Sequence, residues 1–570
     1  MSTTTTTWQE LVTDKKRRQT EAIPKSWLIS TPPPSELIVT GVPEACGLLT
    51  EKEVLITNTE VVLLLEKLAS AEWSSVEVTT AFYKRAIVAQ QLVNCLTEIF
   101  VDRALARARE LDDHLKLTGK VIGPLHGLPI SLKDQLRIKG LETTMALTGL
   151  VSPGYVSWIG KYAEKNSVLV DILYECGANP FVQTNVPQTL MWPETFNNVF
   201  GRTANPHNRS LTSGGSSGGE GALVALRGSP IGIGSDIGGS IRIPAAFNGL
   251  YGLRPSYGRV PYAGAVNSME GQDSVPSVFG PICNSIGGVK TLMKAIIDSK
   301  PWLKDPLAVR KKWDEEDYSL AEHGHGKNLV FGIVWNNGHT VPHPPIIRAL
   351  EMTKAALEAA GHKVIDWLPH RDKELCDTVY AIWNAGCMQD FNSVTSLTGE
   401  PLIDNMLLEA ASSEAVVAGF RPPLNSGATA FELWQLQKTK LKLRQEYLDL
   451  WQETSKMAGT GRPIDAIISP VAPFTATPHG LNKDASYTSI FNALDYPSFV
   501  FPVTRVDPVK DGKKPPHQFL SPEDEANYSI YDPETFLNAP VSLQLSGRTL
   551  EEEAVIAMTE IVDVALKTQK

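Results

Sequence analysis

The sequence contains few cysteines and no long hydrophobic run, and each of these features excludes a class of protein. The six cysteines among 570 residues show no CxxC spacing, which argues against a zinc site and against a disulfide framework. No stretch approaches the roughly 20 consecutive apolar residues that a membrane-spanning helix needs. We expect the cysteines to be small buried residues in a reducing compartment: Cys46, Cys95, Cys176, Cys283, Cys376 and Cys387.

Strongly basic segments and targeting signals are also missing. The formal net charge is -10, and no run of lysine and arginine is long enough to neutralise several phosphates, which argues against nucleic-acid binding. The first residues, MSTTTTTWQELVTDKKRRQ, are polar and lack the apolar core of a secretory signal. We therefore expect a cytoplasmic protein.

The composition is otherwise typical of a folded protein with a large core. Hydrophobic residues make up 42% and charged residues 20%, so neither a fibre nor a disordered chain is indicated. The sequence shows no internal repeat and no long flexible linker. We predict one large domain over residues 57–570, preceded by an N-terminal arm at 1–56 that contains a short basic helix at 14–22 and a proline-rich stretch.

Helical and strand patterns alternate along the main domain. TEVVLLLEKLAS and the segment after the Ser74–Glu77 capping box predict two amphipathic helices. GPLHGLPISLKD, GANPFVQTN, SPIGIGSD and NLVFGIVWNNG predict buried strands, with helices such as SVLVDILYECG and EGALVALRG between them. Long helices are expected at 430–457 and at the C-terminal end. This alternation predicts an α/β fold whose central sheet is largely parallel or mixed and carries helices on both faces.

A glycine-serine loop, GGSSGGEG, occupies residues 214–221. A phosphate-binding Walker loop needs a lysine that this loop lacks, and GIGSDIGG misses the dinucleotide fingerprint because Ile237 stands in place of the third glycine. The hydrolase motif G-x-S-x-G fits at Ser216 and at Ser217, but the preceding RTANPHNRSLTS is polar rather than a hydrophobic strand. None of these three motifs is therefore favoured.

A second glycine-serine loop, IGGSIRIPAA, follows after one predicted helix and one predicted strand, so the serines of the two loops could meet. A serine pair needs a base. His126 and His207 are the histidines nearest in sequence, and Lys133, directly after an apolar stretch, is a third candidate. Burial lowers the pKa of a lysine, so its neutral amine can accept a proton from a hydroxyl.

Several segments together resemble the amidase signature family. The segment from GGSSGGEG to GLRPS resembles the family signature, and GPLHGLPISLKDQ resembles its lysine segment. TNVPQTLMWPETFNNVFGRTANP, DAIISPVAP and APVSLQLSGR extend the resemblance over about residues 60–560. Within the family the sequence is most similar to fungal acetamidases, and its signature loops are nearer to fatty acid amide hydrolase than to the bacterial enzymes. The resemblance implies the amidase signature fold and hydrolysis of a carboxylic amide.

The resemblance also implies a Ser-Ser-Lys triad. By motif, the nucleophile is Ser240 of DIGGS, the bridging serine is Ser216, and the base is Lys133. The family's bridging serine follows a cis peptide bond, so we expect one before Ser216. No metal or organic cofactor is required. The backbone amides expected to bind the oxyanion are those of Ile237, Gly238, Gly239 and Ser240.

Other motif positions imply supporting or lining roles. A buried pair of Asp236 and Arg242 is expected to shape the two loops without reacting. Ser213 is expected to act similarly as a support, and Ser217 matches the motif with no role assigned. Leu190 and Met191 align with positions that line the acyl pocket in the family.

The motifs leave the substrate open. Similarity to the acetamidases favours a small aliphatic amide such as acetamide, hydrolysed to a carboxylate and ammonia. An enzyme for longer acyl amides, resembling fatty acid amide hydrolase, and a glutaminase subunit of a tRNA amidotransferase complex are the alternatives. Residues 402–420 are amphipathic enough to cover an entrance, but their acidic residues disfavour membrane insertion. Whether the chain is a monomer or a homodimer stays open.

Overall fold

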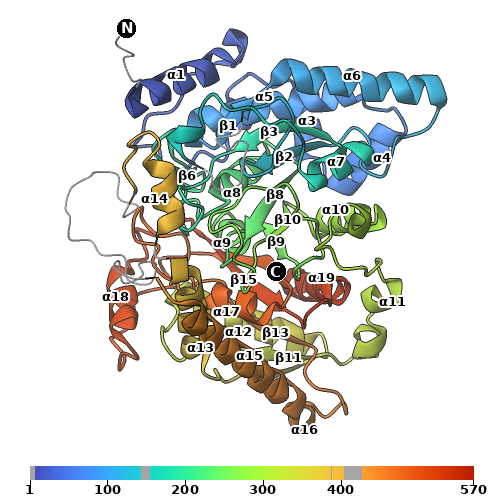
Figure 1. Cartoon of the computed structure of the whole chain (residues 1–570). Helices are drawn as coiled ribbons and strands as arrows, with labels where there is room; N and C mark the ends of the chain where they lie inside the picture. Colours follow the sequence, from blue (N-terminus) through green and yellow to red (C-terminus); the bar gives the residue numbers. More distant parts are fainter. Residues whose placement is uncertain (1–6, 143–153, 387, 404–426, 570) are drawn as a thin grey trace.

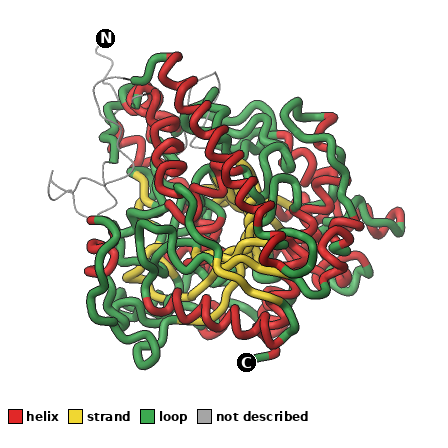
Figure 2. Tube along the Cα trace, turned by 90° about the horizontal axis from the view of Figure 1, so that it is seen from below, coloured by secondary structure: helices red, strands yellow, loops and turns green. Residues whose placement is uncertain are grey.

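The structure is a computed structural model that describes residues 7–142, 154–386, 388–403 and 427–569. In this described part, 11 strands form one central sheet, with helices around it (Figures 1 and 2). From one edge to the other, the strands are β1 (Leu96–Ile99), β3 (Asn179–Thr184), β2 (Pro129–Lys133), β8 (Ile231–Asp236), β10 (Val278–Cys283), β9 (Tyr251–Arg254), β14 (Ser498–Arg505), β15 (Pro540–Ser546), β13 (Ala466–Pro470), β11 (Val330–Ile333) and β12 (Lys363–Asp366).

The sheet is mixed. Strand β2 pairs in parallel with both β3 and β8, and β11 pairs in parallel with both β13 and β12. The remaining neighbours are antiparallel, so the sheet is mixed rather than largely parallel. The central strands are buried along their whole length, because helices cover both faces. The predicted α/β fold with a mixed sheet is confirmed.

The helices follow the predicted segments closely. Ser74 and Glu77 each accept a hydrogen bond from the other's backbone amide, at 3.1 and 3.0 Å, which confirms the capping box that starts α5. The longer helices are α3 (Glu51–Asn58), α4 (Val61–Ala69), α5 (Ser75–Val93), α6 (Val101–Thr118), α7 (Val168–Glu175), α8 (Gly218–Ala225), α10 (Ile286–Asp298), α12 (Pro344–Ala359), α13 (Asp372–Trp383), α15 (Ala430–Glu453), α17 (Ser486–Leu494), α18 (Pro522–Ile530) and α19 (Glu552–Thr568).

Shorter elements complete the chain between these helices and strands. The short helices are α2 (Val42–Ala45), α9 (Arg242–Phe247), α11 (Glu315–Tyr318), α14 (Gln389–Thr395) and α16 (Ser455–Ala458). Two small hairpins lie outside the main sheet and lead toward the first glycine-serine loop: β4 (Phe196–Asn197) with β5 (Gly201–Arg202), and β6 (Ala204–Asn205) with β7 (Asn208–Thr212).

The N-terminal arm packs on the edge of the sheet through helix α1 (Trp8–Glu21), beside β1 in Figure 1. The helix starts earlier than predicted because Thr7 and Glu10 form a capping box. Buried Lys15 pairs with Glu98 and, at 2.7 Å, with Glu142. These contacts attach the arm to the large domain. Helix α3 runs across position 56, and the boundary between arm and domain stays a prediction.

The other expectations about the whole chain have different outcomes. The five described cysteines are free, and four of them are buried, as predicted; the prediction is wrong for Cys46, which is only half-buried, and Cys387 lies outside the described residues. Among the helices of the described part, none is long and apolar enough to cross a membrane. The proposed entrance segment at 402–420 falls almost entirely outside the described residues.

Candidate active site

Lys133 is the last residue of strand β2, and its side chain lies in the protein core. Its Nζ atom is 2.7 Å from the hydroxyl oxygen of Ser216 and 2.8 Å from that of Ser235. The apolar residues of the strand explain this position, because β2 lies between β3 and β8 in the interior of the sheet. The structure therefore brings together the lysine and the serine that the sequence motifs pair.

Burial controls the protonation of this lysine. It lowers the pKa of the Lys133 ammonium to about 7, although the negative charge of Asp236 and that of Glu220 in its ionised form oppose the shift. A substantial fraction of Lys133 is thus a neutral amine near neutral pH. A neutral amine has a lone pair and can accept a proton from the Ser216 hydroxyl.

The two histidines considered as alternative bases make contacts elsewhere. His126 accepts a hydrogen bond from the backbone amide of Ile122 at 3.2 Å. His207 is within hydrogen-bonding distance of the Asn248 carbonyl and of the Arg505 guanidinium, at 3.1 Å each. Of the three candidates, Lys133 is the one that the described part of the chain shows hydrogen-bonded to Ser216.

The glycines of GGSSGGEG are required by close packing. The peptide bond between Gly215 and Ser216 is cis, as the family resemblance implies. A Cβ atom on Gly215 would lie 2.5 Å from the backbone oxygen of Glu194, and one on Gly219 would lie 2.4 Å from the backbone nitrogen of Asn185. Larger residues could not fit there without moving the backbone. The segment is packed against other backbone segments, and its second half, from Gly218 onward, forms the start of α8.

Ser217 connects the two glycine-serine loops. Its backbone amide donates to the carbonyl of Ser240 at 3.2 Å. Its hydroxyl forms 3.3 Å hydrogen bonds with both the carbonyl and the amide of Ser235. The sequence assigned no role to Ser217, and these contacts show that it fixes one loop against the other. Ser213 is also buried, and its carbonyl accepts from the Asn248 side chain at 2.9 Å.

Asp236 and Arg242 form the expected buried ion pair, with 3.0 Å between Asp236 Oδ1 and Arg242 Nη2. Burial alone would raise the pKa of Asp236, but Arg242 and the hydrogen bond from Asn492 outweigh it and hold the pKa far below its usual value. Arg242 also donates to the carbonyl of Thr488 and to the side chain of Gln544. The pair therefore connects the second loop to α17 and β15.

Hydrogen bonds hold the turn before Ser240 in place. The Gly238 carbonyl accepts from the hydroxyls of Thr488 at 2.6 Å and Ser489 at 3.3 Å, which fixes the orientation of the turn. Gly239 has a φ of 137°, a conformation that favours glycine. Its amide already donates to Asp236 Oδ1 at 2.8 Å.

This contact reduces the number of backbone amides that are available to the predicted oxyanion hole. Of the four amides expected to bind the oxyanion, that of Gly239 is engaged by Asp236 and is used to hold the turn. In the described part of the chain, no hydrogen bond occupies the other three, which belong to Ile237, Gly238 and Ser240. These three amides are the available donors.

A small pocket adjoins Ser240, which is itself 8% exposed. Its volume is about 20 Å³, a little more than one water molecule requires. The predicted lining residues Leu190 and Met191 are both in its wall. Sequence reasoning missed the rest of the wall, which includes Trp192, Pro193, Gly215, Ile243, Trp383 and Ala485.

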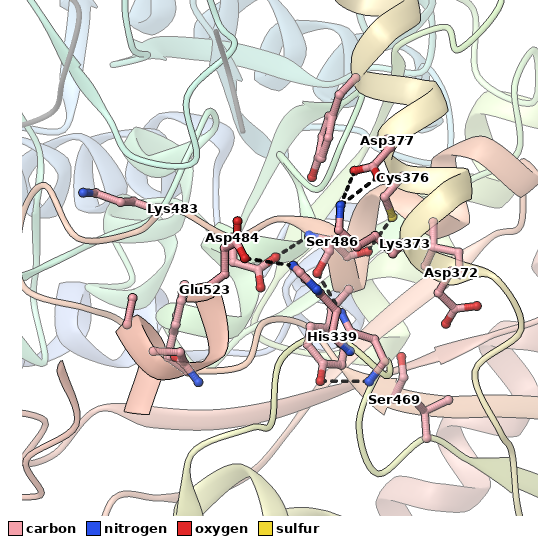
Figure 3. A pocket seen from close by; sticks show the side chains of 18 of the residues that line it. His339, Asp372, Lys373, Cys376, Asp377, Ser469, Lys483, Asp484, Ser486 and Glu523 are labelled. Carbon is pink, nitrogen blue, oxygen red and sulfur yellow. Dashed lines mark hydrogen bonds and ion pairs between the residues drawn. The ribbon is translucent and has the colours of Figure 1, made fainter. Parts of the chain in front are cut away.

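A larger cavity of about 410 Å³ lies between α13, α17 and α18 (Figure 3). Its walls include Asp372, Cys376, Tyr487 and Glu523, and Ser240 is not among its lining residues. This cavity and the small pocket at Ser240 therefore occupy different places in the protein.

Glu220 is a further buried group that sequence reasoning missed. It lies in the first turn of α8 and accepts hydrogen bonds from the hydroxyls of Ser131 at 2.5 Å and Thr184 at 2.9 Å. Burial raises its pKa to about 8, with both hydroxyls and Lys133 opposing the shift. A glutamate in the otherwise apolar GGEGALVA was the available signal. Thr488 and Trp383 gave none, because they are far away in sequence.

Comparison with known proteins identifies the family of the chain. The Amidase family model matches residues 77–556. An acetamidase of Emericella nidulans is 43% identical over 557 residues, covering 97% of each chain, and an acetamidase of Aspergillus oryzae is 43% identical over 556 residues, covering 97% of this chain and 98% of its own.

A solved structure of fatty acid amide hydrolase superposes with a TM-score of 0.88 at 35% identity, covering 98% of this chain and 95% of that one. The family model spans most of the chain, the two acetamidases align over nearly all of it, and the sheet and loops have the matching fold. The chain therefore belongs to the amidase signature family and is an amidase, a hydrolase that acts on amides.

Proposed function

We propose that this amidase hydrolyses small aliphatic amides such as acetamide through a Ser240 acyl-enzyme, with Ser216 and Lys133 as the proton pathway. The observation that carries the proposal is the 2.7 Å contact between Lys133 Nζ and the Ser216 hydroxyl in the interior of the protein. A second observation, the small pocket at Ser240, supports the choice of substrate.

Acylation begins with two proton transfers. Neutral Lys133 takes the proton of Ser216, Ser216 takes that of Ser240, and the Ser240 oxygen attacks the amide carbon. The amides of Ile237, Gly238 and Ser240 stabilise the resulting oxyanion. When the intermediate collapses, the proton returns from Lys133 through Ser216 to the amide nitrogen, and ammonia leaves.

Deacylation repeats the same steps with water. Water loses a proton through Ser216 to Lys133 and attacks the acyl carbon bound to Ser240. Collapse of this second intermediate returns the proton to the Ser240 oxygen and releases the carboxylic acid. Ser235, also hydrogen-bonded to Lys133, holds the amine in position during both half-reactions.

The wall of the small pocket supports a short acyl group. Trp383, at the end of α13, lies against the turn so closely that a Cβ on Gly238 would be 2.8 Å from its ring. A space of about 20 Å³ beside Ser240 favours a short acyl substituent such as a methyl group. The relatives named acetamidase agree with this size.

Alanine variants test the triad. Ser240→Ala, Ser216→Ala and Lys133→Ala should each lower acetamide kcat/KM by about a thousandfold or more, because each removes a required proton carrier or the nucleophile. Ammonia release measures the effect, and circular dichroism checks folding. Lys139→Ala, an exposed lysine nearby, is the matched control. Turnover by Lys133→Ala within about threefold of the wild type would contradict the assignment of the base.

The pH profile tests the state of the lysine. Because only neutral Lys133 can accept a proton, kcat/KM should fall as the pH drops through its pKa of about 7. The decrease should approach about tenfold per pH unit on the acid side. Steady-state rates with acetamide measure it. A profile that stays flat between about pH 5.5 and 8 would contradict a lysine base with this pKa.

Enlarging the pocket tests its role in acyl-chain selection. Trp383→Ala should raise the ratio of hexanamide to acetamide kcat/KM by about tenfold, comparable to the burial of roughly two methylene groups. Competition between the two amides measures the ratio directly. Trp434→Ala, which removes an exposed tryptophan of α15, is the control. An unchanged ratio in the Trp383 variant would mean that another feature limits chain length.

A further inference from the structure

The cavity of about 410 Å³ behind α17 has the composition of a small-molecule site. Its volume lies within the range of about 300 to 1,000 Å³ that such sites usually have. Its floor is buried and largely aromatic or aliphatic, whereas its mouth carries exposed charged residues. The buried floor consists of Val334, Tyr447, Phe474, Tyr487, Ile490 and Phe491.

Helix α17 separates this cavity from the catalytic pocket. On one face, Thr488 and Ser489 donate hydrogen bonds to the Gly238 carbonyl, beside the catalytic turn. On the other face, Tyr487 and Ile490 line the cavity. Residues at these positions point in different directions from an α-helix. A molecule in the cavity would therefore lie behind the oxyanion turn and would not contact Ser240.

Some of the charged side chains around the mouth form ion pairs, and the acidic ones outnumber the basic ones. Lys373 forms an ion pair with Asp377 at 2.7 Å, and His339 lies 3.6 Å from Glu523. Lys483 is exposed and extends away from the labelled acidic groups in Figure 3. The carboxylate of Asp484 accepts from the backbone amide of Ser486 at 2.7 Å. The lining thus contains more acidic than basic side chains.

Asp372 is the buried acid of this cavity, with an exposed fraction of 8%. It accepts a hydrogen bond from the His370 amide at 3.0 Å, and in the described part of the chain it forms no ion pair with lysine or arginine. Burial raises its pKa to about 6, so it is mostly ionised at neutral pH. An ionised carboxylate in such a place is stabilised by a cation.

We propose that this cavity is a second ligand site, separate from Ser240, for an organic ammonium ion with an apolar body. The ammonium group pairs with Asp372, and the acidic residues at the mouth attract it from solution. The rings of Tyr447, Tyr487 and Phe491 contact the apolar body and provide faces for a cation–π interaction.

Isothermal titration of the full chain with phenethylamine tests the site. The wild type should bind one molecule of the amine, and the neutral analogue 2-phenylethanol should bind at least about tenfold more weakly. Asp372→Asn should weaken amine binding by about tenfold or more, because it removes the buried charge. Asp377→Asn, at an exposed position where the carboxylate already pairs with Lys373, should change it by less than about threefold.

Two further measurements test whether a loss of binding in Asp372→Asn reflects misfolding and whether the amine binds in the pocket at Ser240. Ala526→Trp places a large side chain at the mouth from an exposed position on α18 and should abolish binding. Protein whose Ser240 has been blocked with a fluorophosphonate should still bind phenethylamine. The absence of any heat of binding to the wild type would overturn the proposal. So would binding of phenethylamine to both Asp372→Asn and Ala526→Trp with the affinity of the wild type, or loss of binding after Ser240 has been blocked.

Discussion

The desolvation of a single lysine is the constraint on which the proposed active site depends. An ordinary lysine is an ammonium ion at neutral pH and cannot accept a proton, whereas Lys133 is enclosed in the core and has a pKa of about 7. Enclosure requires β2 to lie in the interior of the sheet and requires hydroxyl partners for the amine, which Ser216 and Ser235 supply. Ser216 belongs to the first glycine-serine loop, and Ser235 belongs to β8, the strand that leads into the second.

The surrounding charges keep this arrangement in balance. Asp236 lies near the lysine, but its carboxylate is engaged by Arg242, Asn492 and the amide of Gly239. A free carboxylate at that position would stabilise the ammonium form and remove the base. Glu220, the other nearby acid, has a raised pKa of about 8 and is therefore mainly neutral near pH 7. The charge of Asp236 is thus balanced by its ion pair with Arg242, and that of Glu220 is removed by protonation.

Much of this site could be predicted from the sequence, because Lys133, Ser216 and Ser240 lie in short motifs with local structural causes. The apolar GLPISL predicted a strand that buries Lys133, and EGALVALRG predicted a helix starting behind Ser216; both are present. The order of the strands across the sheet could not be predicted, because strands that are distant in sequence, such as β9 and β14, are neighbours.

The same limit applied to the residues that complete the site. Thr488 and Trp383 reach the turn at Gly238 only after the chain has folded, and the engagement of the Gly239 amide by Asp236 is a matter of local geometry that no motif reveals. The motif also does not explain why GGSSGGEG needs its glycines. In the structure the glycines permit close backbone contacts, and these contacts depend on the segments packed against them.

The central claim is that Ser240 is the nucleophile and that buried Lys133 activates it. Peptide mass spectrometry after reaction with a serine-reactive fluorophosphonate tests this claim most directly. The account predicts one adduct, on the peptide that contains Ser240, and labelling at least about a hundredfold slower in Lys133→Ala. An adduct on Ser216 or Ser217, or labelling of Lys133→Ala at the wild-type rate, would contradict it.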